Sequence, residues 1–492
     1  MKESRRDGEW RSTEAVNASA RPVGVPPLPP AGGEGGAGGG GGARSTGPHA
    51  GARGVALEIL VRVEGEGAYA DRLLDHVPDR RHLAVRDRAL ATELTLGTLR
   101  WQRLLDWHLA RVSHRPLETL DVWVRVLLRL SAYQLAFLDR VPAWAVVSEA
   151  VELAKRRRPR GAADLVNGVL RALAARPRPW PEPAADDPTE ALAIRTSQPT
   201  WLLRRWIDRY GEVEGETLAR AMNERPPLTV RINTLKATAA QVTLALARAG
   251  TTATPCRAAP DGLVLEGAGD PRALAPLRTG WCTVQDEAAI MVGHLVAPEP
   301  GETVADVCAA PGTKTTHLAQ LMENRGRVLA ADPHAGRLGL LAAACARLGA
   351  TIVETRRARV DDLARDTGPV CDRVLVDAPC SNLGVLRRNP DGKWRRREAD
   401  LGPLAAGQLA ILEAAAGLVR PGGVLVYATC SLEPEENEAV VEAFRRRRPE
   451  FVGDPAPARV PPSCLAAPAV LRMLPHRHGS DGFTGFRLRR RA

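Results

Sequence analysis

Two cysteines in this sequence follow apolar runs in the same way. Residues 373–384 read RVLVDAPCSNLG, and residues 424–437 read VLVYATCSLEPEEN. Each strand-like run stops just before a cysteine, Cys380 or Cys430, and turn-forming or polar residues follow. A lone cysteine at a strand end is most often a small core hydrophobe. Two cysteines at equivalent strand ends, in polar surroundings, instead predict a pair of thiols on the ligand-binding edge of a sheet.

A third segment, DVCAAPGTKT at 306–315, has the composition of a ligand-binding turn. A turn of small residues that opens a helix lets backbone N–H groups approach a ligand closely. Asp332 ends the next strand-like run, 20 residues past Gly312, where such folds place an acid against ribose hydroxyls. The turn contains neither G-x-G-x-x-G nor the Walker pattern, so a phosphate cradle is not indicated. Together these features indicate an adenosine-containing cofactor, with a purely structural turn as the alternative.

Two thiols and an adenosine-type cofactor fit one reaction. Carbon 5 of a pyrimidine is a poor nucleophile until a thiolate adds to carbon 6, after which carbon 5 can attack an activated methyl group. One cysteine then serves as the covalent nucleophile, and the second can assist proton removal or release of the enzyme. The chain has only five lysines, and Lys314 and Lys393 lie in these loops. A compact or pKa-shifted ammonium would explain their positions, with chance placement as the alternative.

The elements that must position these loops follow Gly301. Strand-like runs alternate there with helical runs such as RLGLLAAACARLG and PLAAGQLAILEAAAGLV. This alternation predicts a parallel sheet covered on both faces, the doubly wound α/β class. The strand candidates are TVADVCA, RVLAAD, TIVET, RVLVDA and GGVLVYATC.

The rest of the chain divides by composition and periodicity. Helical periodicity runs from Val55 to about Ala175, and RPRPWPEPAADDP then breaks it. A strand–turn–helix pattern follows from residue 226. The predicted organisation is a disordered Pro/Gly-rich tail at 1–50, an all-α domain at 51–177, a linker and connecting helix at 178–222, a small α+β module at 223–298 and the α/β domain at 299–492.

Composition restricts the class of protein. The net charge is +11, and arginines form blocks such as Arg387–Arg388 and Arg445–Arg448. Such blocks suit a phosphate backbone, although a solvated surface is the commoner explanation for any single block. None of the eight cysteines has C-x-x-C spacing, which disfavours zinc ribbons and thioredoxin-like motifs. Neither a secretory segment nor a membrane-spanning run is evident, so we expect a cytoplasmic protein with reduced thiols.

Three segments carry a family resemblance. DVCAAPGTKTTHLA, DRVLVDAPCSNLGVLRRNPDGKW and VYATCSLEPEENEAVV resemble the signatures of the RNA 5-methylcytosine methyltransferases. The Sun/RsmB-like group, which modifies small-subunit ribosomal RNA, is the most similar. LTLGTLRW and LVNGVLRAL in the helical region resemble a NusB-like RNA-binding domain. The resemblance extends over about residues 50–490.

The resemblance implies a site and a substrate. The cofactor would be S-adenosylmethionine and the substrate a cytosine in 16S ribosomal RNA. Cys430 would be the nucleophile and Cys380 would resolve the covalent adduct, with Lys314 and Asp377 beside them. We expect no metal, and a monomer. The implied cofactor-binding residues are Cys308, Ala309, Ala310, Pro311, Gly312, Thr313, Lys314, Asp332 and Asp377.

The sequence departs from the family pattern at two places. Thr313 stands where the family has the second glycine of its turn, and Ala358 lies near the position of a third cofactor-contacting acid, for which Asp361 or Asp362 could substitute. Because carbon 6 is inaccessible in a stacked helix, the cytosine must be flipped or single-stranded. We expect basic surfaces of the helical and α+β domains to read the RNA. The alternatives are a transfer-RNA cytosine methyltransferase and a non-catalytic NusB-like RNA-binding regulator.

Overall fold

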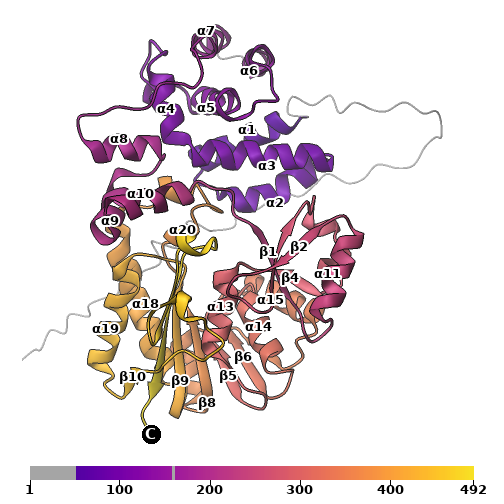
Figure 1. Cartoon of the computed structure of the whole chain (residues 1–492), viewed down its shortest axis with the longest axis vertical. Helices are drawn as coiled ribbons and strands as arrows, with labels where there is room; N and C mark the ends of the chain where they lie inside the picture. Colours follow the sequence, from indigo (N-terminus) through magenta and orange to yellow (C-terminus); the bar gives the residue numbers. More distant parts are fainter. Residues whose placement is uncertain (1–50, 158–160) are drawn as a thin grey trace, which may run out of the picture. The chain divides into compact units, whose positions relative to one another are not determined.

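The computed structural model describes residues 51–157 and 161–492 (Figure 1). The predicted tail at 1–50 lies outside the described residues. In the part of the chain that is described, every helix is too short or too polar to cross a bilayer.

The first domain is helical and is organised around α5 (Val122–Phe137). This helix is apolar on most faces, and α1, α3, α4, α6 and α7 all pack against it, as the sequence predicts for a central helix. Asp121 caps α5 by accepting a hydrogen bond from Trp123 N. The other helices are α1 (Ala52–Gly65), α2 (Ala70–Arg80), α3 (Val85–Arg100), α4 (Gln102–Ala110), α6 (Ala143–Arg157) and α7 (Ala162–Ala174).

Three helices and a small sheet connect this domain to the next. The four-stranded antiparallel sheet has the order β2-β3-β1-β4, and α11 begins at a capping box formed by Thr238 and Gln241. The predicted α+β fold of the small module is therefore confirmed. Its elements and the helices before it are α8 (Pro188–Arg195), α9 (Thr200–Tyr210), α10 (Glu212–Ala221), β1 (Leu228–Ile232), α11 (Ala239–Arg248), β2 (Thr252–Pro255), β3 (Gly262–Glu266), α12 (Ala275–Arg278) and β4 (Cys282–Val284).

The large sheet has the order β11-β12-β13-β9-β8-β5-β6-β7, and β10 pairs with β13. Strands β5 to β9 are parallel, as predicted, but β13 is antiparallel to β9, so the complete sheet is mixed. The prediction of a parallel sheet is wrong at this edge, where β13 is antiparallel to β9, β10 and β12. Only residues 474–482 connect β12 to β13, and this connection is too short for the crossover that a parallel pair needs. The strands are β5 (Thr303–Asp306), β6 (Arg327–Ala331), β7 (Val353–Arg356), β8 (Cys371–Asp377), β9 (Val419–Thr429), β10 (Phe451–Gly453), β11 (Leu465–Ala467), β12 (Val470–Met473) and β13 (Phe483–Arg490).

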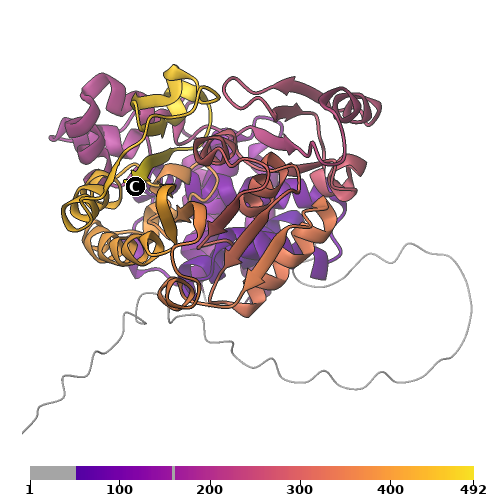
Figure 2. The ribbon, with the colours of Figure 1, turned by 90° about the horizontal axis from the view of Figure 1, so that it is seen from below.

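Helices cover both faces of this sheet (Figure 2). Alternate residues of one strand enter different cores: Leu375 packs on the side of α13 and α14, and Val374 packs on the side of α18 and α19. Helix α13 falls in the range predicted for the small module, but its side chains belong to the core of the large sheet. The helices are α13 (Glu287–Val296), α14 (Thr313–Leu321), α15 (Ala335–Leu348), α16 (Val360–Thr367), α17 (Gly392–Arg395), α18 (Leu401–Ala416), α19 (Glu438–Arg447) and α20 (Pro475–His478).

Candidate active site

The two predicted cysteines meet at the carboxyl edge of the large sheet. Strands β8 and β9 are parallel neighbours in which Asp377 lies opposite Ala428, so the loops that follow them start side by side. Cys380 Sγ and Cys430 Sγ are 3.0 Å apart. Both cysteines are free thiols, with Cys380 buried and Cys430 partly exposed. The structure therefore brings together two groups that are 50 residues apart in sequence.

A third side chain, Asn382, touches both thiols. Its Oδ1 accepts a hydrogen bond from Cys430 Sγ at 2.9 Å and lies 3.6 Å from Cys380 Sγ. The hydrogen bond with Cys380 and the partial removal of the Cys430 thiol from water raise the pKa of Cys430 well above its usual value. Sequence analysis missed Asn382. Its backbone has φ +64°, a conformation that asparagine tolerates better than most residues, and this preference was the available signal.

Lys314 and Asp377 form an ion pair beside the thiols. Lys314 Nζ donates to Asp377 Oδ2 at 2.7 Å and lies 4.9 Å from the centre of the Phe483 ring. Burial acts to lower the pKa of Lys314, but the charge and hydrogen bond of Asp377 outweigh it and raise that pKa. The charge of Lys314 in turn acts to lower the pKa of Cys430, against the larger effects that raise it. The ammonium therefore favours a thiolate at this position.

The predicted cofactor turn connects β5 to α14. Gly312 is the N-cap of α14 with φ +107°, and a Cβ at this position would lie 2.4 Å from Leu341 Cδ1. Asp306 ends β5, where burial raises its pKa to about 7, and its Oδ1 has no hydrogen-bond partner among the described residues. Thr313 is an exposed first residue of α14 without a positive φ, so the position does not require glycine. Arg337 Nη2 donates to the carbonyl oxygen of Ala310 at 2.6 Å and holds the turn from α15.

Asp332 follows β6 on the same edge. It is buried, its Oδ1 accepts a hydrogen bond from His334 N at 2.9 Å, and its Oδ2 is 3.4 Å from Arg337 Nη1. The remaining residues of the turn, Cys308 to Pro311, lie between β5 and α14, where burial raises the pKa of Cys308. The β5–α14 turn and Asp332 thus occupy the two positions from which a doubly wound sheet binds an adenosine-containing cofactor.

Comparison with known proteins identifies the family. The NusB family matches residues 50–175, the ferredoxin-like domain of RsmF/B-like methyltransferases matches residues 198–271, and the 16S rRNA methyltransferase RsmB/F family matches residues 293–489. The probable ribosomal RNA small subunit methyltransferase B of Bacillus subtilis (strain 168) is 39% identical over 438 residues, which span 88% of this chain and 97% of that protein. The chain belongs to the RsmB/F family of 16S rRNA methyltransferases.

Other comparisons agree with this family. The probable ribosomal RNA small subunit methyltransferase B of Synechocystis sp. is 37% identical over 436 residues, spanning 88% of this chain and 98% of that protein. The crystal structure of PH0851 superposes with a TM-score of 0.76 at 29% identity, covering 89% of this chain and 98% of that one. The predicted fold class, the NusB-like domain and the assignment as a methyltransferase are confirmed.

Asp361 and Asp362 are the two candidates to replace the third acid that the RsmB/F pattern places near Ala358. Ala358 packs against the core on the α18 side of the sheet. Asp361 and Asp362 lie in the first turn of α16, where they pair with Arg359 at 3.3 Å and Arg365 at 3.2 Å, respectively. Both carboxylates therefore already have cationic partners, and a role for either in cofactor binding stays a prediction.

Lys393 is a structural link. It is almost fully buried, which lowers its pKa well below the usual value. Lys393 Nζ donates to three acceptors from the preceding domains, namely the carbonyl oxygens of Arg100 at 3.2 Å and Ser197 at 3.1 Å, and Asn223 Oδ1 at 2.5 Å. The lysine thus fastens the segment after Cys380 to the helical and connecting regions, a contact that spacing in the sequence does not reveal.

The arginine blocks differ in their availability to RNA. Arg387 is buried against Asp481 at 2.8 Å, and Arg388 pairs with Asp286 at 2.7 Å, so this block is not free to bind phosphate. Arg445 to Arg447, at the end of α19, are exposed, although Arg446 pairs with Glu442 at 3.9 Å and Arg447 pairs with Glu413 at 2.9 Å. The second block is the more accessible of the two, but it lies in the α/β domain and not in the helical and α+β domains, where we expect the basic surfaces that read the RNA.

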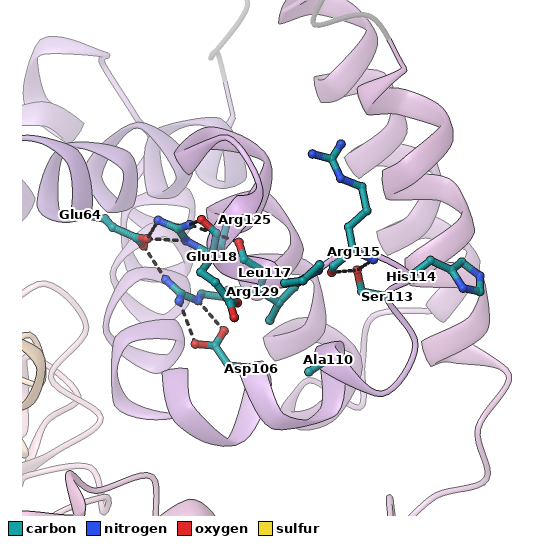
Figure 3. A pocket seen from close by; sticks show the side chains of 11 residues that line it. Glu64, Asp106, Ala110, Ser113, His114, Arg115, Leu117, Glu118, Arg125 and Arg129 are labelled. Carbon is teal, nitrogen blue, oxygen red and sulfur yellow. Dashed lines mark hydrogen bonds and ion pairs between the residues drawn. The ribbon is translucent and has the colours of Figure 1, made fainter.

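A cavity of about 770 Å³ lies in the helical domain, away from the cysteines (Figure 3). Arg129 donates hydrogen bonds there to both Asp106 and Glu64, and Arg125 Nε donates to Glu64 at 2.7 Å. Since the arginines and acids neutralise one another, we assign this cavity no ligand.

One further cluster has side chains of metal-binding types. Possible ligand atoms of Asp261, His294 and His317 lie within 4.8 Å of one another. Each histidine Nε2 is within hydrogen-bond distance of an Asp261 oxygen, at 2.8 and 2.9 Å, and Gln320 donates to the same carboxylate. These hydrogen bonds connect the small module to helices α13 and α14.

Proposed function

We propose that this chain methylates carbon 5 of a cytosine in small-subunit ribosomal RNA, with S-adenosylmethionine as the methyl donor. The observation that carries the proposal is the 3.0 Å separation of the Cys380 and Cys430 sulfurs at the sheet edge that also holds the cofactor turn. Two thiols at this distance can act on one pyrimidine ring.

Cys430 is the nucleophile in this proposal. It is the more exposed thiol, and its sulfur, once deprotonated, forms a bond to carbon 6 of the cytosine. The electron pair of the carbon 5–carbon 6 double bond becomes available at carbon 5. Carbon 5 would take the methyl group as the bond between that methyl and the donor's sulfonium sulfur breaks, which leaves a neutral thioether. The ammonium of Lys314 favours the thiolate that starts this step.

Cys380 completes the reaction. After methylation, the proton on carbon 5 passes to a base, its electrons re-form the double bond, and the bond between carbon 6 and Cys430 breaks. Cys380 lies where it can take part in this proton transfer, 3.0 Å from the departing sulfur. Asp377 supplies an acceptor that suits the exocyclic amino group of cytosine, a group that uracil lacks.

The cofactor turn fits S-adenosylmethionine. Backbone N–H groups at the start of α14 can donate to the cofactor, and the carboxylate of Asp332 can accept from ribose hydroxyls. The unpartnered buried Oδ1 of Asp306 suits a cationic amino group. The residues from Cys308 to Lys314, with Asp332 and Asp377, would hold the cofactor. S-adenosylmethionine supplies an electrophilic methyl group when bound.

RNA recognition is assigned to the helical domain and the small module. The target base must leave its stack to reach the thiols, and surfaces outside the catalytic edge must hold the flanking RNA. The exposed arginines of α19 would add a cationic contribution from the methyltransferase domain.

The proposal is tested with labelled S-adenosylmethionine and ribosomal RNA from cells that lack the gene. We expect label in 16S RNA at one or a few cytosines, which bisulfite sequencing then locates. Label in transfer RNA alone would favour the alternative substrate, and label in neither RNA would refute the proposed activity.

A further inference from the structure

Glu436 is a fully buried carboxylate close to both cysteine loops. It lies in the short 3₁₀ helix that follows Cys430, at 0% exposure. In the described part of the chain no arginine, lysine or histidine forms an ion pair with it; its hydrogen-bond donors are neutral groups. A buried carboxylate without a cation costs several kcal/mol unless donors saturate it.

Four donors saturate this carboxylate. Oε1 accepts from Ser381 N at 2.8 Å and from Gln408 Nε2 at 2.9 Å. Oε2 accepts from the hydroxyls of Ser381 and Ser431. The backbone around Glu436 is fixed as well, since Tyr427 OH donates to its carbonyl oxygen at 2.5 Å.

The two serines that bind Glu436 each lie next to one of the two cysteines. Ser381 directly follows Cys380, and Ser431 directly follows Cys430. One carboxylate therefore binds the residue next to each thiol, and the two hydroxyls are 3.2 Å from each other. A displacement of either loop would break a hydrogen bond to a buried charge, so the loops are held in one relative position.

We propose that Glu436 is a positioning residue, whose carboxylate fastens the two cysteine loops together and sets the separation of their sulfurs. The inference rests on the proposed function, because the separation matters for catalysis only if both thiols act on one base. Misplacement of a reacting group by about 1 Å can cost about 100-fold in rate. Loss of the carboxylate should therefore lower kcat by about that factor and leave KM for S-adenosylmethionine unchanged.

Two sets of variants test the proposal in the full-length protein. Glu436→Ala removes the carboxylate, and the double variant Ser381→Ala/Ser431→Ala removes only the hydroxyl donors, which keeps the test valid if the first variant does not fold. Glu442→Gln is the matched control, since that glutamate is exposed on α19.

The readouts are kcat, KM for S-adenosylmethionine, and bridging of Cys380 to Cys430 by dibromobimane, with Cys380→Ser as the unbridged reference. We expect both test variants to bridge more slowly and to lose about 100-fold in kcat, with the Glu442→Gln control like the wild type. Folded test variants with wild-type kcat and bridging would overturn the positioning role. A wild-type protein that bridges its thiols but methylates no RNA would instead overturn the proposed function.

Discussion

Replacement of Gly312 by alanine adds one methyl group at the most constrained point of the cofactor turn. Gly312 has φ +107°, and the new Cβ would lie 2.4 Å from Leu341 Cδ1 and 3.3 Å from Leu341 Cα. Leu341 is fully buried and cannot move aside freely. Strain at such a φ and overpacking of a core together cost about 2–5 kcal/mol. We expect Gly312→Ala to lower the free energy of unfolding by this amount.

Gly339→Ala is the matched control. Gly339 lies in α15, two residues before Leu341, and a Cβ there has no atom within 4 Å. The same methyl group should therefore stabilise the protein by about 0.5–1 kcal/mol. Urea unfolding followed by circular dichroism measures both changes, and calorimetric titration measures the affinity for S-adenosylmethionine. If Gly312→Ala kept the wild-type unfolding midpoint and cofactor affinity, the turn would not be the close-packed cofactor site described above.

The remaining predictions concern charge. Because the pKa of Cys430 is raised, kcat/KM for methyl transfer should climb about tenfold per pH unit around neutrality, and a plateau already present at pH 6.5 would contradict this. Lys314→Met should lower the rate at least about tenfold at pH 7.5 and recover part of it at high pH, since it removes a charge that favours the thiolate; an equal loss at every pH would argue for a different role. Burial lowers the pKa of His317 from 6.5 to about 4, so the unfolded state binds an extra proton between these values. Stability should therefore fall by about 3 kcal/mol as the pH drops through this window, and His317→Gln should flatten that dependence in acid titrations of urea unfolding.

Strand ends were the part of the fold that the sequence predicted best. Apolar runs such as the one before Asp377 are long enough to specify buried strands, and turn formers after them mark the carboxyl edge. The direction of β13, which is antiparallel to β9, could not be predicted from the sequence. An apolar run indicates that a segment forms a strand, but it does not indicate in which direction this strand runs beside β9.

The sequence predicted the reactive residues of the site but not the residues that support them. Cys380, Cys430 and Lys314 stand out by residue type and position. Asn382 and Glu436 do not, because their roles depend on contacts between segments about 50 residues apart. Lys393 was noticed for its type, but its partners come from two other regions of the chain.

A covalent bond between the sulfur of Cys430 and carbon 6 of the cytosine is the claim on which the proposed reaction depends. The most direct measurement is denaturing electrophoresis of the Cys380→Ser and Cys430→Ser variants after incubation with 16S RNA and S-adenosylmethionine. We expect Cys380→Ser to accumulate a protein–RNA complex that survives denaturation and maps to Cys430, and Cys430→Ser to form no complex and transfer no methyl group. A stable complex with Cys430→Ser, and none with Cys380→Ser, would contradict the assignment of the nucleophile.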